Sequence, residues 1–381
     1  MSQENSSVID THMHVGLKGD RWGNLGHFSP WYQRQLVYKI FLLYARIDEA
    51  SVCDTVLMEK IIEAADQSGV DKVMCLALDH VFDEAGKPQK NQSHMWVANE
   101  YIVKKLRDQL PSKILFGASV HPYDSNFIDR AKKCVNDDAK LMKWLPSAQH
   151  IDLADERVGK AMEFLARAGN NGKALPLLLH VGPEHAIFSD DPRTESYNFL
   201  SWTWKDKFAN FFRNKKSKLF VPRVEKILQN IRAAVDAGGI IIFAHCGLPY
   251  FVSGFLGRFL EHSDFKMVKN FLTETGNVAP GGACYADVSA ICTPFRKKYF
   301  DDIEKLPRER LLFGSDFPTP VFELSADPKE ILKDFEAVLK GDFWRIIIPQ
   351  DNLIDVCYRE LKHFFPGHPM FTNSNKIIQT D

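Results

Sequence analysis

Two histidines separated by one residue close the first apolar run of the chain, Val8–His14, which reads V-I-D-T-H-M-H. In a β-strand alternate side chains point the same way, so His12 and His14 would project together. Two imidazoles on one face of a strand can hold a single divalent cation. An H-x-H pair also occurs by chance, and its meaning depends on the other polar residues of the chain.

Three further polar residues stand at the ends of apolar runs. His180 closes A-L-P-L-L-L-H, His245 closes I-I-I-F-A-H and Asp316 closes L-L-F-G-S-D. A hydrogen-bonded structural role at a strand end would suit any one of them, but the same placement of all five favours a shared site. Imidazole and carboxylate ligands with one open position suit Zn²⁺ and a catalytic water. Mn²⁺ or Fe²⁺ would also accept them.

Eight short apolar runs have the composition of buried parallel strands. Helical patterns with a 3.6-residue period separate several of them, at Thr55–Gln67, Glu156–Ala168 and Arg223–Ala237. This alternation predicts a single (β/α)8 TIM-barrel domain over residues 1–381. A doubly wound open sheet would want a glycine-rich turn after the first strand, where this chain has T-H-M-H-V. The expected strands are Val8–His14, Val70–Leu78, Ile114–His121, Lys140–Leu145, Leu175–Val181, Gly239–Cys246, Ala283–Ala290 and Arg310–Asp316.

Barrel enzymes place their active sites at the carboxyl ends of the strands, where the five polar residues would meet. Two connections at that end, 15–51 and 182–220, are long enough to be functional loops. Two helical patterns after the last strand, Asp327–Leu339 and Asp351–Phe365, are expected to cover the outside or the bottom of the barrel.

The H-x-H pair, the two later histidines and F-G-S-D-F-P at Phe313–Pro318 resemble the amidohydrolase superfamily. More narrowly, the chain is similar to the amidohydrolase 2 branch, which includes aminocarboxymuconate-semialdehyde and resorcylate decarboxylases beside hydrolases. The resemblance extends to Ala118–Pro122, Lys143–Gln149 and Tyr285–Ser289, but it does not cover the two long loops.

The resemblance implies a role for each candidate residue. One divalent metal would be bound by His12, His14, His180 and Asp316, with His245 as the acid/base group and Asp316 doubling as proton acceptor. Asp10 would be a carboxylate that orients a ligand histidine, or a purely structural residue. Lys143 corresponds to the lysine that is carboxylated in two-metal relatives, although we expect one metal here and a lysine that binds a substrate anion or pairs with an acidic neighbour.

The favoured function is a metal-dependent hydrolase acting on a small carboxylate-bearing or cyclic substrate. A non-oxidative decarboxylase would use the same ligands, and a third hypothesis is a barrel without catalysis that serves as a binding protein. Metal content separates the third hypothesis from the first two, and released CO₂ separates the second from the first.

Composition limits the partners and the compartment. The net charge is −1, with 45% apolar and 25% charged residues, so no global attraction to nucleic acid or membranes is expected. Seven cysteines without a C-x-x-C pair indicate neither a disulfide framework nor a thiolate zinc site. The polar N-terminus lacks the apolar core of a secretion signal, so we expect a cytoplasmic enzyme with a small-molecule substrate. The basic, aromatic segment 202–218 is expected to be a lid or subunit contact, and the aromatic stretch Phe28–Tyr44 a pocket wall, a homodimer interface or plain packing.

Overall fold

The fold is taken from a computed structural model, which describes residues 7–181, 217–248, 263–274, 282–293, 296–319, 321–322, 324, 349 and 351–378. The expected helix Asp327–Leu339, most of the loop 182–220 and nearly all of the basic segment 202–218 lie outside these residues.

Eight parallel strands form one sheet, and each lies inside or within one residue of a run that the sequence predicts. The sheet is closed between its first and last strands, because Thr11 N donates to Phe313 O (3.1 Å), Asp316 N to His12 O (2.7 Å) and His14 N to Phe317 O (2.8 Å). The structure is therefore the expected barrel and not an open doubly wound sheet. In sheet order the strands are β1 (Ile9–His14), β3 (Lys72–Leu76), β5 (Ile114–Ala118), β6 (Ala139–Trp144), β7 (Leu177–Leu179), β8 (Ile240–Phe243), β9 (Ala283–Asp287) and β10 (Leu311–Leu312).

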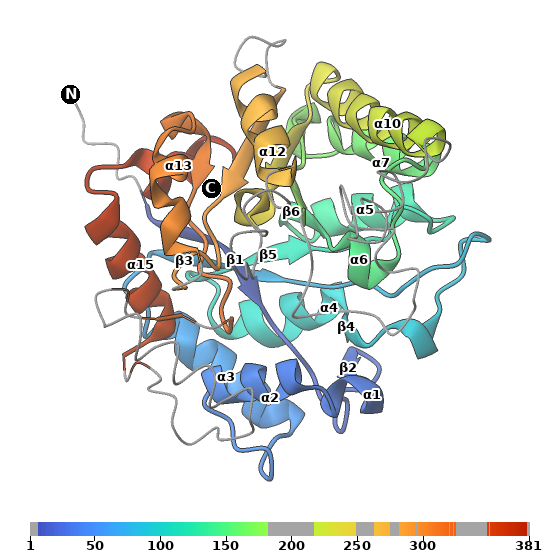
Figure 1. Cartoon of the computed structure of the whole chain (residues 1–381). Helices are drawn as coiled ribbons and strands as arrows, with labels where there is room; N and C mark the ends of the chain where they lie inside the picture. Colours follow the sequence, from blue (N-terminus) through green and yellow to red (C-terminus); the bar gives the residue numbers. More distant parts are fainter. Residues whose placement is uncertain are drawn as a thin grey trace.

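Helices surround the barrel and cover the outer faces of the strands (Figure 1). In α3 (Asp54–Asp66) the buried residues Leu57, Ile61 and Ala65 recur every fourth position, the spacing that turns one helical face toward the sheet. The helices α7 (Glu156–Leu165) and α10 (Ser217–Asp236) lie side by side (Figure 1). The outer ring also includes α5 (Phe127–Asn136), α12 (Ser263–Glu274), α13 (Phe300–Glu304) and α15 (Leu353–Phe364). None of the helices in the described ranges is both long and apolar enough to cross a membrane.

The connection 15–51 has secondary structure of its own. It contains β2 (Gly26–Phe28), which pairs antiparallel with β4 (Met95–Val97), followed by α1 (Pro30–Gln33) and α2 (Leu36–Tyr44). The aromatic ring of Phe28 packs against those of Tyr32, Tyr38 and Phe41 within this unit. Phe28, Tyr32 and Tyr38 belong to the same buried core as residues of α3 and β3, so the aromatic stretch contributes to packing on the barrel.

The inside of the barrel is filled by the inward-facing side chains of all eight strands, among them Met74, Leu141, Leu178 and Ile242. The C-terminal segment completes this core, because Ile377 and Ile378 pack with the same side chains and are 7% and 1% exposed. The last described residues thus close one end of the barrel, which leaves the other end for chemistry.

Replacement of Ile378 by alanine is expected to lower the free energy of unfolding by about 2–5 kcal/mol, because it removes buried methyl groups and leaves a cavity. Chemical denaturation measures this loss. Ile128→Ala is the matched control: Ile128 is 49% exposed, so its loss should change stability by less than about 0.5 kcal/mol. Equal effects of the two substitutions would show that the C-terminal segment does not belong to the core.

Candidate metal centre

Three of the predicted ligands meet where β1 and β10 close the barrel. His12 Nε2 lies 3.2 Å from His14 Nε2 and 3.3 Å from Asp316 Oδ1, and His14 Nε2 lies 3.2 Å from the same oxygen. The alternation along β1 sends both imidazoles to one side, as expected, and Asp316 reaches them from a left-handed backbone conformation with a φ of 63°. Residues 304 positions apart along the chain therefore offer three ligand atoms to one point.

The spacing of these three atoms suits a metal ion. A tetrahedral ion with bonds of about 2.1 Å holds its ligand atoms about 3.4 Å apart. The Oδ1 atom of Asp316 is buried and accepts no hydrogen bond within the described residues, whereas its Oδ2 atom accepts one from the hydroxyl of Thr319 at 2.7 Å. Burial alone would raise the pKa of Asp316, but His245, His12 and His14 hold it well below its ordinary value, so the carboxylate is ionised. The residues present therefore fit a divalent cation.

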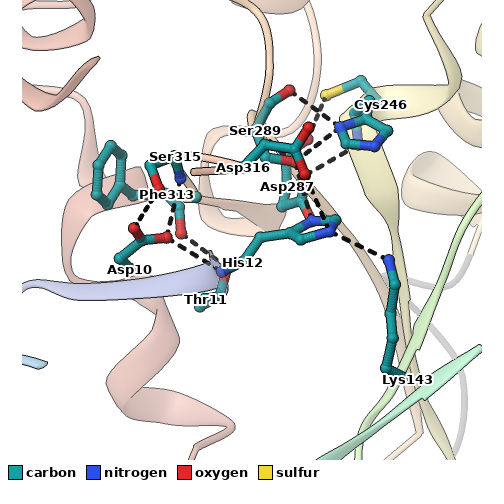
Figure 2. A network of polar contacts seen from close by, with 12 residues as sticks. Asp10, Thr11, His12, Lys143, Cys246, Asp287, Ser289, Phe313, Ser315 and Asp316 are labelled. Atoms are coloured by element: carbon teal, nitrogen blue, oxygen red, sulfur yellow. Dashed lines mark hydrogen bonds and ion pairs between the residues drawn. The ribbon is translucent and has the colours of Figure 1, made fainter. Parts of the chain in front are cut away.

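Asp287, at the end of β9, orients the ring of His12. Its Oδ2 atom accepts a hydrogen bond from His12 Nδ1 at 2.9 Å (Figure 2). This bond directs the Nε2 lone pair of His12 toward His14 and Asp316. Its Oδ1 atom accepts the backbone N–H groups of His245 (2.9 Å) and Ser289 (3.0 Å). Burial would raise the pKa of Asp287, but His12, His245 and the side-chain hydroxyl of Ser289 outweigh burial and hold the pKa below its ordinary value.

Asp10 contacts the backbone of the centre. It accepts hydrogen bonds from His12 N (3.1 Å), Ser315 N (2.9 Å) and the Ser315 hydroxyl (2.5 Å), and so joins the end of β1 to the residue before Asp316 (Figure 2). Burial raises the pKa of Asp10 to about 7. The carboxylate that accepts a hydrogen bond from the His12 ring nitrogen Nδ1 is Asp287, which sequence reasoning did not select. Asp10 instead joins the backbone at His12 to the backbone at Ser315.

His245 lies beside the three converging atoms and is not part of a strand. It belongs to the 3-10 turn Ala244–Gly247, in which His245 has a φ of 55° and Cys246 a φ of 54°. The ring of His245 stacks on that of His12 at 5.1 Å, and its Nδ1 atom contacts the Ser289 hydroxyl at 2.8 Å. Burial lowers the pKa of His245 to about 3, so the ring is neutral at pH 7. Cys246 is buried and donates to Asp287 O at 3.3 Å, which agrees with a packing role.

His180 follows β7 and is buried, with its ring 5.0 Å from that of His245 in an edge-on arrangement. It does not join either group of described residues whose ligand atoms all lie within 4.8 Å of one another. One group is His12, His14 and Asp316, and the other is His12, His245 and Asp287. Burial lowers the pKa of His180 well below its ordinary value, so the ring is neutral, as a metal ligand must be.

Lys143 reaches the centre from β6. Its side chain faces the barrel interior, is 1% exposed and places Nζ 3.1 Å from His12 Nε2 (Figure 2). The amine donates to the lone pair that His12 would offer to a metal. This contact supports the assigned tautomer of His12, and it also means that a bound cation and the charged amine would compete for the same atom.

The substitution Lys143→Met is expected to tighten metal binding by at least about tenfold, because it removes a positive charge adjacent to a ligand atom. Competition with a chromophoric chelator measures the affinity. Lys140→Met, on the same strand with its Nζ on Asp138 (2.6 Å), is the control and should leave the affinity unchanged. Weaker binding by Lys143→Met would instead indicate that the lysine, in a carboxylated form, is itself a ligand.

Comparisons with known proteins found no matching family model and no matching curated protein. Solved structures with a similar chain path include amidohydrolase 2 from Bifidobacterium longum subsp. infantis, at 12% identity and a TM-score of 0.46, covering 98% of this chain and 99% of that one. An amidohydrolase from Burkholderia multivorans with bound zinc has 10% identity and a TM-score of 0.45, with 94% and 98% covered. The IDCase of Metarhizium anisopliae has 14% identity and a TM-score of 0.45, with 99% and 98% covered.

Proposed function

We propose that this protein is a metal-dependent hydrolase of the amidohydrolase type that binds one divalent ion, Zn²⁺ in the first instance. The observation that carries the proposal is the convergence of His12 Nε2, His14 Nε2 and Asp316 Oδ1 within 3.2–3.3 Å of one another. His180 is proposed as the fourth ligand on the strength of the sequence resemblance. Its burial and its position beside His245 support this assignment.

A zinc ion bound by these residues would lower the pKa of its water ligand to about 7. Around it, Asp287 holds the ring of His12 with the Nε2 lone pair toward the centre. Asp316 and His245 are the two neighbouring groups that can accept a proton from water and return it to a leaving group. Both are buried, which keeps bulk water from competing for that proton.

The charges near the centre favour an anionic substrate. Lys143 and Arg296 are both buried, and both act on the pKa values of the centre's histidines. The Arg296 guanidinium donates to Ala290 O and Leu248 O, both at 3.1 Å, which fixes it beside the turn that holds His245. Two buried cations and a metal ion suit a small carboxylate-bearing molecule. A decarboxylase would also need a site that prefers a carboxylate-bearing substrate, and this activity is the second candidate.

The proposal is tested on protein stripped of metal and reloaded with Zn²⁺, Mn²⁺ or Fe²⁺ in turn. Amides, lactones and cyclic carboxylic acids, including hydroxybenzoates, are screened by mass spectrometry with parallel detection of CO₂. Metal-dependent addition of water to a substrate supports the hydrolase, and metal-dependent CO₂ release supports the decarboxylase. Failure to bind metal would contradict both and favour a barrel that only binds ligands.

We also propose the reducing cytoplasm as the compartment, because all seven cysteines are free and six of them are buried. We further propose that the substrate is a small molecule and that the protein has no nucleic-acid or membrane partner. We also propose that the protein forms a homodimer. Sedimentation at several protein concentrations would test the dimer.

A further inference from the structure

Ser289, two residues beyond β9, touches three members of the centre at once. Its hydroxyl donates to Asp287 Oδ1 and lies 3.0 Å from His12 Nδ1 (Figure 2). The same hydroxyl lies 2.8 Å from His245 Nδ1. Ser289 is 0% exposed. One buried hydroxyl therefore stands between a candidate metal ligand and the candidate acid/base histidine.

The carboxylate of Asp287 determines where the hydrogen of the Ser289 hydroxyl lies. Asp287 Oδ1 already accepts two backbone N–H groups, from His245 and Ser289, so it acts as an acceptor and carries no proton. Two oxygens as close as Asp287 Oδ1 and Ser289 Oγ require a hydrogen between them, and only the serine can supply it. The hydroxyl has a single hydrogen, so toward both imidazoles it presents lone pairs alone.

The tautomer of each histidine follows in turn. His245 Nδ1 faces two acceptors, the Ser289 hydroxyl oxygen and the Ser289 backbone oxygen at 3.2 Å. His12 Nδ1 faces the same hydroxyl oxygen and Asp287 Oδ2. Each Nδ1 must therefore carry a hydrogen, and a neutral imidazole has no second hydrogen for Nε2.

We infer that Ser289 is a positioning residue that, together with Asp287, holds His12 and His245 in the Nδ1–H tautomer with both Nε2 lone pairs unprotonated. For His12 this directs a lone pair at the candidate metal. For His245 it decides the direction of the first proton transfer: the neutral ring can accept a proton at Nε2 but has none to give there. A proton taken from water leaves an imidazolium, which then returns that proton to the leaving group. This last role rests on the proposed function, whereas the tautomers do not.

The test is nuclear magnetic resonance of metal-free protein carrying ¹⁵N in the histidine rings, where protonated and unprotonated ring nitrogens resonate far apart. The ring ¹⁵N signals that disappear in His245→Gln are the signals of His245. The wild type is expected to show Nδ1 protonated and Nε2 unprotonated. Ser289→Ala should move the tautomer ratio of His245 toward Nε2–H by about five- to tenfold, the effect of one lost hydrogen bond.

The matched control is Ser93→Ala. Ser93 is also buried, and among the residues that the structure describes its hydroxyl bonds only the backbone of Val81 and Gln89, so its loss should leave the tautomer unchanged. If Ser289→Ala does not fold, Ser289→Cys keeps the side-chain shape with a weaker donor and acceptor, and should give a smaller shift in the same direction.

A wild-type His245 that carries its hydrogen on Nε2, or a ratio that Ser289→Ala leaves unchanged, would overturn the inference. Once a substrate is found, Ser289→Ala should lower kcat about tenfold and leave KM within about twofold, since the serine acts through His245. An equal change of kcat in Ser93→Ala would also count against it. Because the spectra need neither metal nor substrate, the tautomers can hold even if the proposed hydrolase activity fails.

Discussion

The variant Asp287→Asn is expected to lose metal affinity by about 10–100-fold and turnover by up to about 10⁴-fold. The asparagine oxygen can still accept the backbone N–H groups of His245 and Ser289. Its amide nitrogen then faces His12 Nδ1 and donates to it, so His12 must carry its own hydrogen on Nε2. A hydrogen would occupy the lone pair that the metal needs.

Metal content by mass spectrometry after equilibration with a fixed free zinc concentration measures this loss. Asp54→Asn is the control, because Asp54 is also fully buried and accepts backbone N–H groups, from Gly19, Arg21 and Trp22. It should lose stability but keep its metal. Full metal occupancy in Asp287→Asn would show that the ring of His12 is not oriented by this carboxylate.

The variants His245→Gln and His180→Ala are expected to separate catalysis from metal binding. His245→Gln should keep the metal and lose turnover by about 10²–10⁴-fold, because it removes a proton acceptor beside the ion and none of the three converging ligand atoms. His180→Ala should lose most of the metal if His180 is the fourth ligand. Metal content and single-turnover rates on the same preparations measure both effects.

The opposite pattern would change the assignment. Loss of metal in His245→Gln together with full occupancy in His180→Ala would make His245 the ligand and His180 the acid/base group. The 5.0 Å contact between their rings makes this exchange of roles a real alternative that only the paired variants resolve.

The barrel could be predicted because strands covered on both faces are continuous apolar runs, which the sequence displays directly. The same property explains how Asp316 and the histidines were found, since an ionisable residue at the end of such a run is conspicuous. Asp287 was missed because the predicted strand ran on to Ala290, whereas β9 ends at Asp287. With the correct end, Asp287 is the ionisable residue that closes the strand and shares a face with Ala283 and Tyr285.

Other features had no local pattern that could reveal them. His245 was expected on a strand, but it lies in a turn where it and Cys246 adopt left-handed conformations. Both residues are hydrogen-bonded to Asp287, about 40 positions along the chain. The pairing of β2 with β4 joins segments about 70 residues apart, and only tertiary packing selects it. The role of the Ser289 hydroxyl depends on its contacts with His12, His245 and Asp287, which no local sequence pattern reveals.

The central claim is that distant residues converge on a cation, and anomalous X-ray scattering from crystals grown with zinc tests it most directly. Data collected above and below the zinc absorption edge should show one strong peak, about 2.0–2.2 Å from His12 Nε2, His14 Nε2 and Asp316 Oδ1. A peak confined to the protein surface, or no peak within bonding distance of these three atoms in zinc-saturated crystals, would contradict it.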